Sequence, residues 1–373
     1  MALRQNVWSL DEWYAQAVQG DGSTDYSAYT GFYVWGANNG GFGNNTQDVS
    51  KTPITIPGSS WGTVLSMGMS GQNTDSVGYI NYVGSNDQLR TWGRNEYGQL
   101  GLGNNTNKSS TQYVSNGWSY VSSGAQHMCG VKTDGTLWCW GNNENGSLAQ
   151  NNRANRNEPF QVGTDTNWQQ VECGNSTSMA TKTDGTLWSW GRNDYGELGD
   201  NSKTKRSSPV QVGSETDWSN ARLSGGQTSM SGVKTDGTGW VWGANHQGQM
   251  GLGQPDNATR TTPHQVPGTW GTMDVGYWSM IGAKTDGTLY CWGRNEVGQL
   301  GQNNTSLSRY PAQVGTSTDW ASHRGACSMG DKQGGACKQD GTLWMWGEGD
   351  SGRLGQDNET DYSSPRQVGT DTD

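Results

Sequence analysis

Seven of the Trp-Gly dipeptides along the chain recur at steps of 48 to 57 residues, and this spacing limits the possible folds most strongly. Self-similarity at a fixed period is the signature of a repeat architecture, in which each copy is one supersecondary unit that buries its apolar side chains only against its neighbours. The chain is therefore predicted to contain seven copies of a unit of about fifty residues. Their tryptophans are Trp35, Trp92, Trp140, Trp190, Trp242, Trp292 and Trp346.

The units share a common sequence motif, which is complete in the third copy. A tryptophan strand at 118–124 precedes the hairpin Lys132–Thr136, and the segments 138–141 and 159–162 follow. Asp-Gly between two short apolar stretches predicts a type I′ hairpin turn, in which both central residues need positive φ. The two tryptophans of Trp-x-Trp-Gly share one face of a strand. The motif predicts an all-β unit of short antiparallel strands.

A lysine precedes each Asp-Gly turn. We expect these lysines to form a basic ring on one rim of the molecule, as solvated hairpin tips beside the turn aspartates. They are Lys132, Lys182, Lys234, Lys284 and Lys338.

A second tryptophan opens most units, at Trp61, Trp118, Trp168, Trp218, Trp270 and Trp320. A seventh is missing after the last unit, and Trp13 is its expected counterpart, because Trp13 precedes Trp35 by the 22 residues that separate Trp118 from Trp140. The two ends of the chain would then complete one unit together and leave no unpaired sheet edge. A short helix from Ser9 is the alternative, since Ser9-x-x-Glu12 resembles a capping box.

The phrase from Trp92 to Gly101, Trp-Gly-Arg-Asn-Glu-Tyr-Gly-Gln-Leu-Gly, resembles the regulator-of-chromosome-condensation repeat. The resemblance covers residues 13–373 and implies a single seven-bladed β-propeller of four-stranded antiparallel blades, closed by pairing of the N- and C-terminal segments. The expected units are about 13–60, 61–117, 118–167, 168–217, 218–269, 270–319 and 320–373, after a leader at 1–12. Two departures from the family pattern are that only His127 fills a frequent histidine position, and that the first two units lack the Lys-Thr-Asp-Gly-Thr hairpin.

Composition excludes several function classes. The net charge of −10 disfavours binding to nucleic acid, and no apolar run is long enough for membrane insertion. Met1–Gly20 does not resemble a secretory signal. Six cysteines without a Cys-x-x-Cys pair are expected to be reduced thiols, and four scattered histidines indicate no metal site. Since no catalytic motif appears, we expect no enzyme activity, no catalytic residue and no cofactor.

The units also look like repeat proteins of bacteriophage virions, especially those of marine phages. That likeness implies a virion component, such as a tail, fibre or decoration protein, made in the host cytoplasm. Its expected partners are other virion proteins, or a host surface glycan or receptor. The alternatives are a soluble cytoplasmic module that binds protein or glycan and, third, a small-GTPase exchange factor like the founding members of the repeat family.

Candidate partner-binding residues are those that depart from the repeat, because copied residues hold the fold. Insertions between the first two strands are expected around Gly71–Gly84 in the second unit and Ala326–Ala336 in the seventh. Together with the leader they would form one docking region, whereas Tyr97 and Tyr195 would lie on the opposite, loop-rich face. Neutral drift of loops is the alternative explanation. The candidates are Trp8, Asn73, Asp75, Tyr79, Tyr97, Tyr195, Trp278, Asp331 and Lys332.

Overall fold

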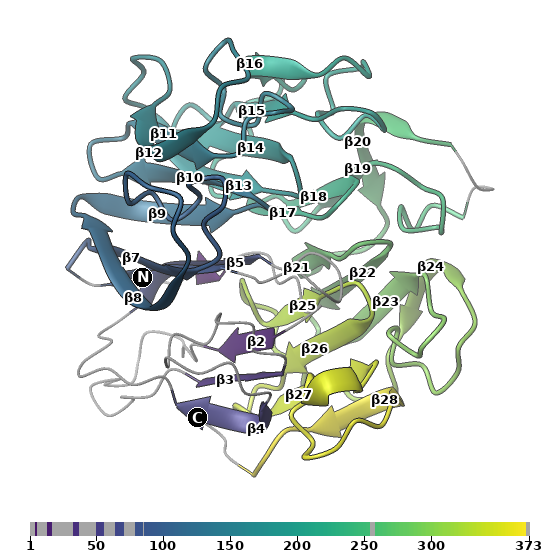
Figure 1. The fold of residues 1–373 in the computed structure, drawn as a ribbon. Coiled ribbons are helices and arrows are strands. Elements are labelled where there is room, and N and C mark those ends of the chain that lie inside the picture. The colour runs from purple at the N-terminus through teal and green to yellow at the C-terminus, as the bar shows by residue number, and fades with distance from the viewer. Residues whose placement is uncertain are drawn as a thin grey trace.

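The computed structural model describes residues 86–253 and 258–370, together with strands at 4–5, 13–16, 33–36, 50–55, 64–70 and 79–84. The described strands form seven sheets, most of them four-stranded and antiparallel. In Figure 1 the sheets follow one another around a common centre, with β9, β13, β17, β21 and β25 on the inside. No helix in the described part of the chain is long and apolar enough to cross a membrane.

The third to seventh units each form one complete sheet. The third contains β9 (Trp118–Ser123), β10 (His127–Lys132), β11 (Leu137–Gly141) and β12 (Arg156–Gln161). The fourth contains β13 (Trp168–Cys173), β14 (Thr177–Lys182), β15 (Leu187–Gly191) and β16 (Arg206–Gln211), and the fifth β17 (Arg222–Gly225), β18 (Ser229–Val233), β19 (Gly239–Gly243) and β20 (Arg260–Val266). The sixth contains β21 (Trp270–Val275), β22 (Ser279–Lys284), β23 (Leu289–Gly293) and β24 (Ser308–Gln313). The seventh contains β25 (Cys327–Met329), β26 (Gln333–Cys337), β27 (Leu343–Gly347), the short 3₁₀ turn η2 (Asp350–Gly352) and β28 (Tyr362–Gln367).

The second unit contributes β5 (Val64–Ser70), β6 (Tyr79–Gly84), β7 (Leu89–Gly93) and β8 (Lys108–Ser115). A fifth strand of this sheet, β1 (Arg4–Gln5), lies parallel to β5 on its inner side, so part of the leader belongs to the fold. The first unit forms the sheet β2 (Trp13–Gln16), β3 (Tyr33–Gly36) and β4 (Ser50–Thr55).

The register of β2 differs from the expectation for Trp13. Trp13 pairs with Gly36, as His127 pairs with Gly141, so β2 occupies the place of a second strand and not that of an opening strand. The last strand, β28, pairs with β27 in its own sheet. Among the described strands, the two ends of the chain therefore share no sheet. The helix proposed from Ser9 begins outside the described residues, and Trp13–Gln16 are extended.

Neighbouring units are joined by a repeated hydrogen bond. The indole Nε1 of the Trp-Gly tryptophan donates to the carbonyl oxygen of the second residue of Gly-x-Leu-Gly in the preceding unit. This motif is Gly-x-Leu-Ala in the third unit and Gly-x-Met-Gly in the fifth. The pairs are Trp140–Gln99 (3.0 Å), Trp190–Ser147 (2.8 Å), Trp242–Glu197 (2.8 Å), Trp292–Gln249 (2.9 Å) and Trp346–Gln299 (2.8 Å). Trp35 makes the same bond with Arg353 at 3.2 Å, which places the first unit beside the seventh.

The Asp-Gly hairpins form where they were predicted, with a different turn type. In the third unit the N–H of Gly135 donates to the carbonyl of Lys132, and only Gly135 has positive φ, at 80°. This is a three-residue loop, a type I turn closed by a glycine bulge. The Asp134 carboxylate accepts from the N–H and hydroxyl of Thr136, and these bonds lower the pKa of Asp134. The Thr136 hydroxyl accepts in turn from the indole of Trp138.

The hairpin lysines are not solvated tips. Each lies over two aromatic rings of its own unit: the Nζ of Lys234 is 4.5 Å from the ring centroids of both Trp218 and Trp240. This ammonium also pairs with Glu215 and Asp217, at 2.6 and 2.8 Å. Stacking of a cation on an aromatic face stabilises it, more so when it is withdrawn from water. The same stacking on two aromatic rings holds for Lys132, Lys182, Lys284 and Lys338.

The insertion in the seventh unit lies earlier than expected. The turn 330–332 between β25 and β26 has the length of the turn 124–126 in the third unit. The extra residues precede Cys327, within Ala321–Ala326, and they reach inner strands of other units. Arg324 donates to the side-chain oxygen of Gln170 at 2.9 Å, and the carbonyl of Ser322 accepts from Arg222 at 2.7 Å. Of the insertion expected around Gly71–Gly84 in the second unit, residues 71–78 lie outside the described residues, and Tyr79–Gly84 form strand β6.

Two buried carboxylates lie on the inner strands beside this insertion. Glu172 accepts hydrogen bonds from Ser122 and Tyr120, yet burial raises its pKa to about 8. Asp274 accepts from the Ser328 hydroxyl and from the N–H of Met329, at 3.0 and 2.8 Å, and burial raises its pKa as well. Buried polar side chains therefore lie on the inner strands of the described structure.

The expectation that all cysteines are reduced is wrong for one pair. Cys129 and Cys139 face each other across β10 and β11 and form a disulfide. They are ten residues apart on neighbouring strands of one hairpin, a spacing at which register alone brings two side chains together. The other four cysteines are not part of this disulfide: Cys173, Cys291, Cys327 and Cys337.

Candidate functional site

Two kinds of connection meet at one end of the units, here called the loop face. They are the turns between first and second strands and the long loops between third and fourth strands. In the third unit the N–H of Asn142 donates to the carbonyl of Gln126, which joins loop to turn. The N–H of Glu348 and the carbonyl of Lys332 form the same bond in the seventh unit. Asp331 and Lys332 therefore share a face with Tyr97 and Tyr195, and the prediction of opposite faces is wrong for them.

A buried asparagine organises each regular loop. Asn143 donates to the carbonyl of Ala154 at 3.1 Å and accepts from the N–H of Leu148 at 3.0 Å. In the seventh unit Gly349 takes this position, and its N–H donates to the carboxylate of Asp361 at 2.8 Å. The seventh loop is thus held by an acidic side chain from its far end.

The seventh loop also reverses a charged pair. In the fourth unit Arg192 follows Trp-Gly and lies 3.7 Å from Glu197, within Gly-x-Leu-Gly. At the corresponding positions of the seventh unit, the Oε2 atom of Glu348 lies 2.7 Å from the Nη1 atom of Arg353. The other carboxylate oxygen of Glu348 accepts from Lys332, also at 2.7 Å. Both ends of the pair have exchanged sign relative to the fourth unit.

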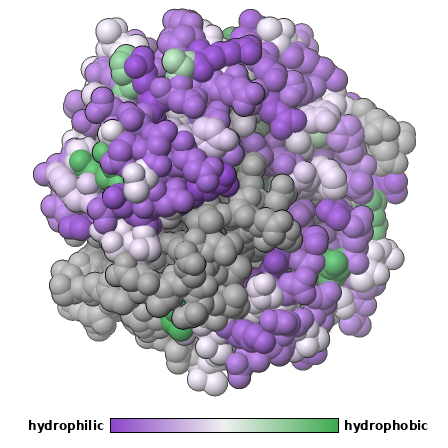
Figure 2. Space-filling model, in the orientation of Figure 1, coloured by the Kyte–Doolittle hydropathy of each residue, from purple (hydrophilic) through white to green (hydrophobic). Residues whose placement is uncertain are grey.

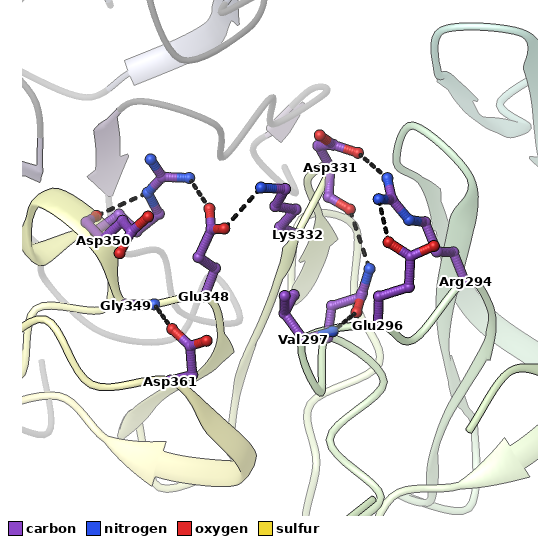
Figure 3. A network of polar contacts seen from close by, with 11 residues as sticks. Arg294, Glu296, Val297, Asp331, Lys332, Glu348, Gly349, Asp350 and Asp361 are labelled. Carbon is purple, nitrogen blue, oxygen red and sulfur yellow. Dashed lines mark hydrogen bonds and ion pairs between the residues drawn. The ribbon is translucent and has the colours of Figure 1, made fainter. Parts of the chain in front are cut away.

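The sixth unit adds an arginine stacked on a tryptophan. The guanidinium of Arg294 lies 5.0 Å from the ring of Trp278, bonds to Glu296, and lies 3.4 Å from Asp331 of the seventh unit. Figure 3 shows the contacts of Arg294 beside those of Glu348, with Asp331 between Arg294 and Lys332. We call Trp278, Arg294, Asp331, Lys332, Glu348 and Arg353 the inter-unit cluster.

Burial and charge set the ionisation of the cluster. Burial raises the pKa of Asp331, and the neighbouring Arg294 opposes that shift. The hydrogen bond with Glu348 raises the pKa of Lys332. The Lys332 side chain is 28% exposed, so the ion pairs leave it within reach of a partner.

Three predicted residues, Trp278, Asp331 and Lys332, thus converge on one site. Arg294, Glu348 and Arg353 were missed, although the sign reversal at the last two positions is visible in the sequence. Tyr97 and Tyr195 lie in two other units and do not join them. Tyr195 is half-buried, with its ring 5.0 Å from that of His246. Trp8, Asn73 and Asp75 lie outside the described residues, and Tyr79 begins β6 opposite Gly93.

Repeated four-stranded sheets around a common centre define a β-propeller-like repeat protein. The sequence model described as the regulator of chromosome condensation (RCC1) repeat matches residues 86–131, 134–181, 184–228, 286–323 and 340–373. A second model of the same description matches 118–147 and 168–197. The chain belongs to the RCC1 repeat family. None of the curated proteins compared with it matches the chain.

Solved structures share the fold at low sequence identity. Yeast RCC1 (Prp20) bound to Kap60 has a TM-score of 0.77 and 17% identity, over 95% of this chain and 91% of that one. Prp20p of Saccharomyces cerevisiae, described with its binding to Gsp1p and histones, has a TM-score of 0.78 and 17% identity, over 91% and 86%. Human WBSCR16 has a TM-score of 0.71 and 18% identity, over 86% and 85%.

Proposed function

We propose that the chain is a non-catalytic, closed seven-bladed propeller that binds a protein partner through the inter-unit cluster on its loop face. The observation that carries the proposal is the convergence of Trp278, Asp331 and Lys332, from two units, on a rigid set of ion pairs. The residues that stabilise the fold recur from unit to unit, whereas Trp278, Asp331 and Lys332 do not. Clustered departures are expected where one specific partner is recognised.

Seven sheets and the bond between Trp35 and Arg353 support closure of the ring. The contact between the first and second units, which would complete it, falls mostly on residues outside those described. Radial repetition of sheets leaves only short, protected edge strands, and loops then become the natural contact surface.

The chemistry of the cluster suits a protein. Tryptophan and arginine are enriched among residues that dominate binding energy at protein interfaces. The side shown in Figure 2 is largely hydrophilic, with small separate apolar patches in its described part. The net charge of −10 disfavours a nucleic acid. The structural neighbours described with Kap60, Gsp1p and histones are themselves protein binders.

The setting we propose for this binding is a bacteriophage virion, because the repeats resemble those of phage virion proteins. Peptide mass spectrometry across a sucrose gradient of the native source material tests it. The chain should sediment with large particles beside capsid or tail proteins. If it stays at the top as a species of 40.3 kDa, the virion role is wrong.

The binding site has its own test. Trp278→Ala and Arg294→Ala should each prevent incorporation into particles, whereas Arg192→Ala, at the corresponding position of the fourth unit, should not. All three proteins should keep the wild-type melting temperature within a few degrees. Normal incorporation of both cluster variants would show that the partner binds elsewhere.

A further inference from the structure

A compact set of metal-ligand atoms lies buried between the third and fourth units. His127 and Cys129, on β10, and Cys173, at the end of β13, place one ligand atom each within 4.8 Å of the others. Their exposed fractions are 1%, 0% and 0%. The set joins two sheets, and its members are up to 46 residues apart in sequence.

A fourth polar atom completes the set. The hydroxyl of Ser178, on β14, is 2.9 Å from Nε2 of His127 and 3.8 Å from the sulfur atoms of both Cys129 and Cys173. Zinc bonds of about 2.0 Å to nitrogen and about 2.3 Å to sulfur imply ligand separations of roughly 3.3–3.8 Å in a tetrahedron. The three separations from Ser178 lie within about 0.4 Å of these values, and the other three ligand atoms are within 4.8 Å of one another.

The repeat does not explain these residues. Register gives the corresponding positions at the next interface, where Thr177 and Met179 replace the histidine and first cysteine, and Gly225 and Met230 replace Cys173 and Ser178. The following interface has Ser229, Ser231, Val275 and Met280 there. Of the three interfaces compared, only that between the third and fourth units has a histidine, two cysteines and a serine at these positions. The other two interfaces form the same sheets without them.

We propose that this interface is a site for a thiophilic divalent cation of the Zn²⁺ type, held by His127, Cys129 and Cys173 with Ser178 in the fourth position, and that the Cys129–Cys139 disulfide keeps it empty. In the disulfide state Cys129 has no free thiol. Reduction by a dithiol breaks the S–S bond: two electrons and two protons convert the two half-cystines to thiols, and the dithiol becomes a disulfide. The ion then displaces one proton from Cys129 and one from Cys173.

The charges of the loaded site balance. Burial lowers the pKa of His127 to about 4, so the imidazole is neutral and a lone pair is available at neutral pH. Two thiolates neutralise the divalent ion, which removes the main cost of placing it in a dry interior. Without an ion, burial raises the pKa of Cys173 to about 12 and the thiol stays protonated.

Cobalt is the probe, because tetrahedral Co²⁺ with thiolate ligands has visible absorption bands. The full-length protein is reduced with a phosphine, refolded with Co²⁺ and then titrated with Zn²⁺. We expect one Co²⁺ per chain, bands that Zn²⁺ removes, and a rise in melting temperature with Zn²⁺. The oxidised protein should give no bands. Bands of equal strength in the oxidised protein would overturn the role of the disulfide.

A matched pair of variants tests the ligands. Cys173→Ser removes a ligand, while Cys291→Ser removes an equally buried thiol at another interface. Cobalt affinity should fall by more than about tenfold in the first and stay unchanged in the second. His127→Gln, checked by circular dichroism, is a second ligand variant in case Cys173→Ser misfolds. Absence of bands from the reduced wild type, or their persistence in both ligand variants, would refute the site.

Discussion

The indole Nε1 of Trp35 donates to the carbonyl oxygen of Arg353, a residue 318 positions away. The bond copies those between successive units, from the same atom to the same place in Gly-x-Leu-Gly. It makes the seventh unit the predecessor of the first in space. A chain of repeats that ran on without returning would leave Trp35 without this partner.

The first prediction concerns this junction. Trp35→Phe removes the indole donor of this buried hydrogen bond, at a cost of about 1–3 kcal/mol in the free energy of unfolding. Trp140→Phe makes the same change at an internal junction and should cost a similar amount. Urea unfolding of both variants measures the two costs. A loss for Trp140→Phe alone would mean that the first and last units are not joined in solution.

The repeat made much of the fold predictable. Trp-Gly, Asp-Gly and Pro-x-Gln-Val each mark a strand end or a turn, and the register of five complete sheets follows them. The place of Trp13 was not predictable from spacing, because a distance of 22 residues does not show which strand of a sheet a tryptophan begins. The turn type was also not predictable from Asp-Gly alone. A type I′ turn needs positive φ at both Asp134 and Gly135, and only Gly135 has it.

The second prediction concerns pH. Burial raises the pKa of Glu172 to about 8, from an ordinary value of 4.5 in the unfolded chain. The protonated form is therefore favoured by folding, and its contribution to stability is complete below pH 4.5. Between pH 4.5 and pH 8 this contribution to the free energy of unfolding is lost as pH rises, at up to about 1.4 kcal/mol per pH unit.

Glu172→Gln removes this titration and keeps a polar side chain of the same size. The variant should unfold with a free energy that depends less on pH than that of the wild type between pH 5 and 8, and it should gain most at pH 8. Denaturant titrations at pH 5, 6, 7 and 8 measure the difference. Parallel pH profiles of the two proteins would show that Glu172 titrates normally.

The third prediction concerns the inserted segment of the seventh unit. Arg324 donates to Gln170 in the fourth unit and lies 5.6 Å from the ring of Tyr120 in the third. Arg324→Ala should lower the free energy of unfolding by about 1–3 kcal/mol, because a buried amide oxygen loses its donor. His323→Ala, one residue away and exposed, should change it by less than about 0.5 kcal/mol. Equal effects would contradict a bracing role for Arg324.

The candidate site was only partly predictable. Departure from the repeat identified Trp278, Asp331 and Lys332, but their contact depends on Arg294, which looks like an ordinary copy of Arg94 and Arg192. Its orientation toward the next unit depends on the turn 330–332, and no local pattern specifies it. The metal-ligand set was missed because its members belong to different units, and sequence spacing shows neither the interface nor the register.

The fourth prediction concerns the stacked lysines. Lys234→Met keeps the apolar stem over Trp218 and Trp240 but removes the charge, so two aromatic faces and two carboxylates lose their cation. The expected loss of stability is about 1–2 kcal/mol. Lys203→Met, on an exposed loop, serves as the control and should be neutral. Thermal unfolding distinguishes the two, and a neutral Lys234→Met would show that its stem alone matters.

The fifth prediction separates stability from binding in the inter-unit cluster. Glu348→Arg alone places a third cation beside Lys332 and Arg353, and it should destabilise the protein by about 3 kcal/mol or more, since it breaks a buried pair. Adding Arg353→Glu restores the order of charges found at Arg192 and Glu197, and Asp350 stands where Asp194 pairs with Arg192. Most of the lost stability should return, which a double-mutant cycle of unfolding free energies measures.

Lys332 keeps no acceptor at residue 348 in the double variant, so partner binding should stay weak although the fold recovers. Recovery of both stability and binding would assign the cluster a purely structural role.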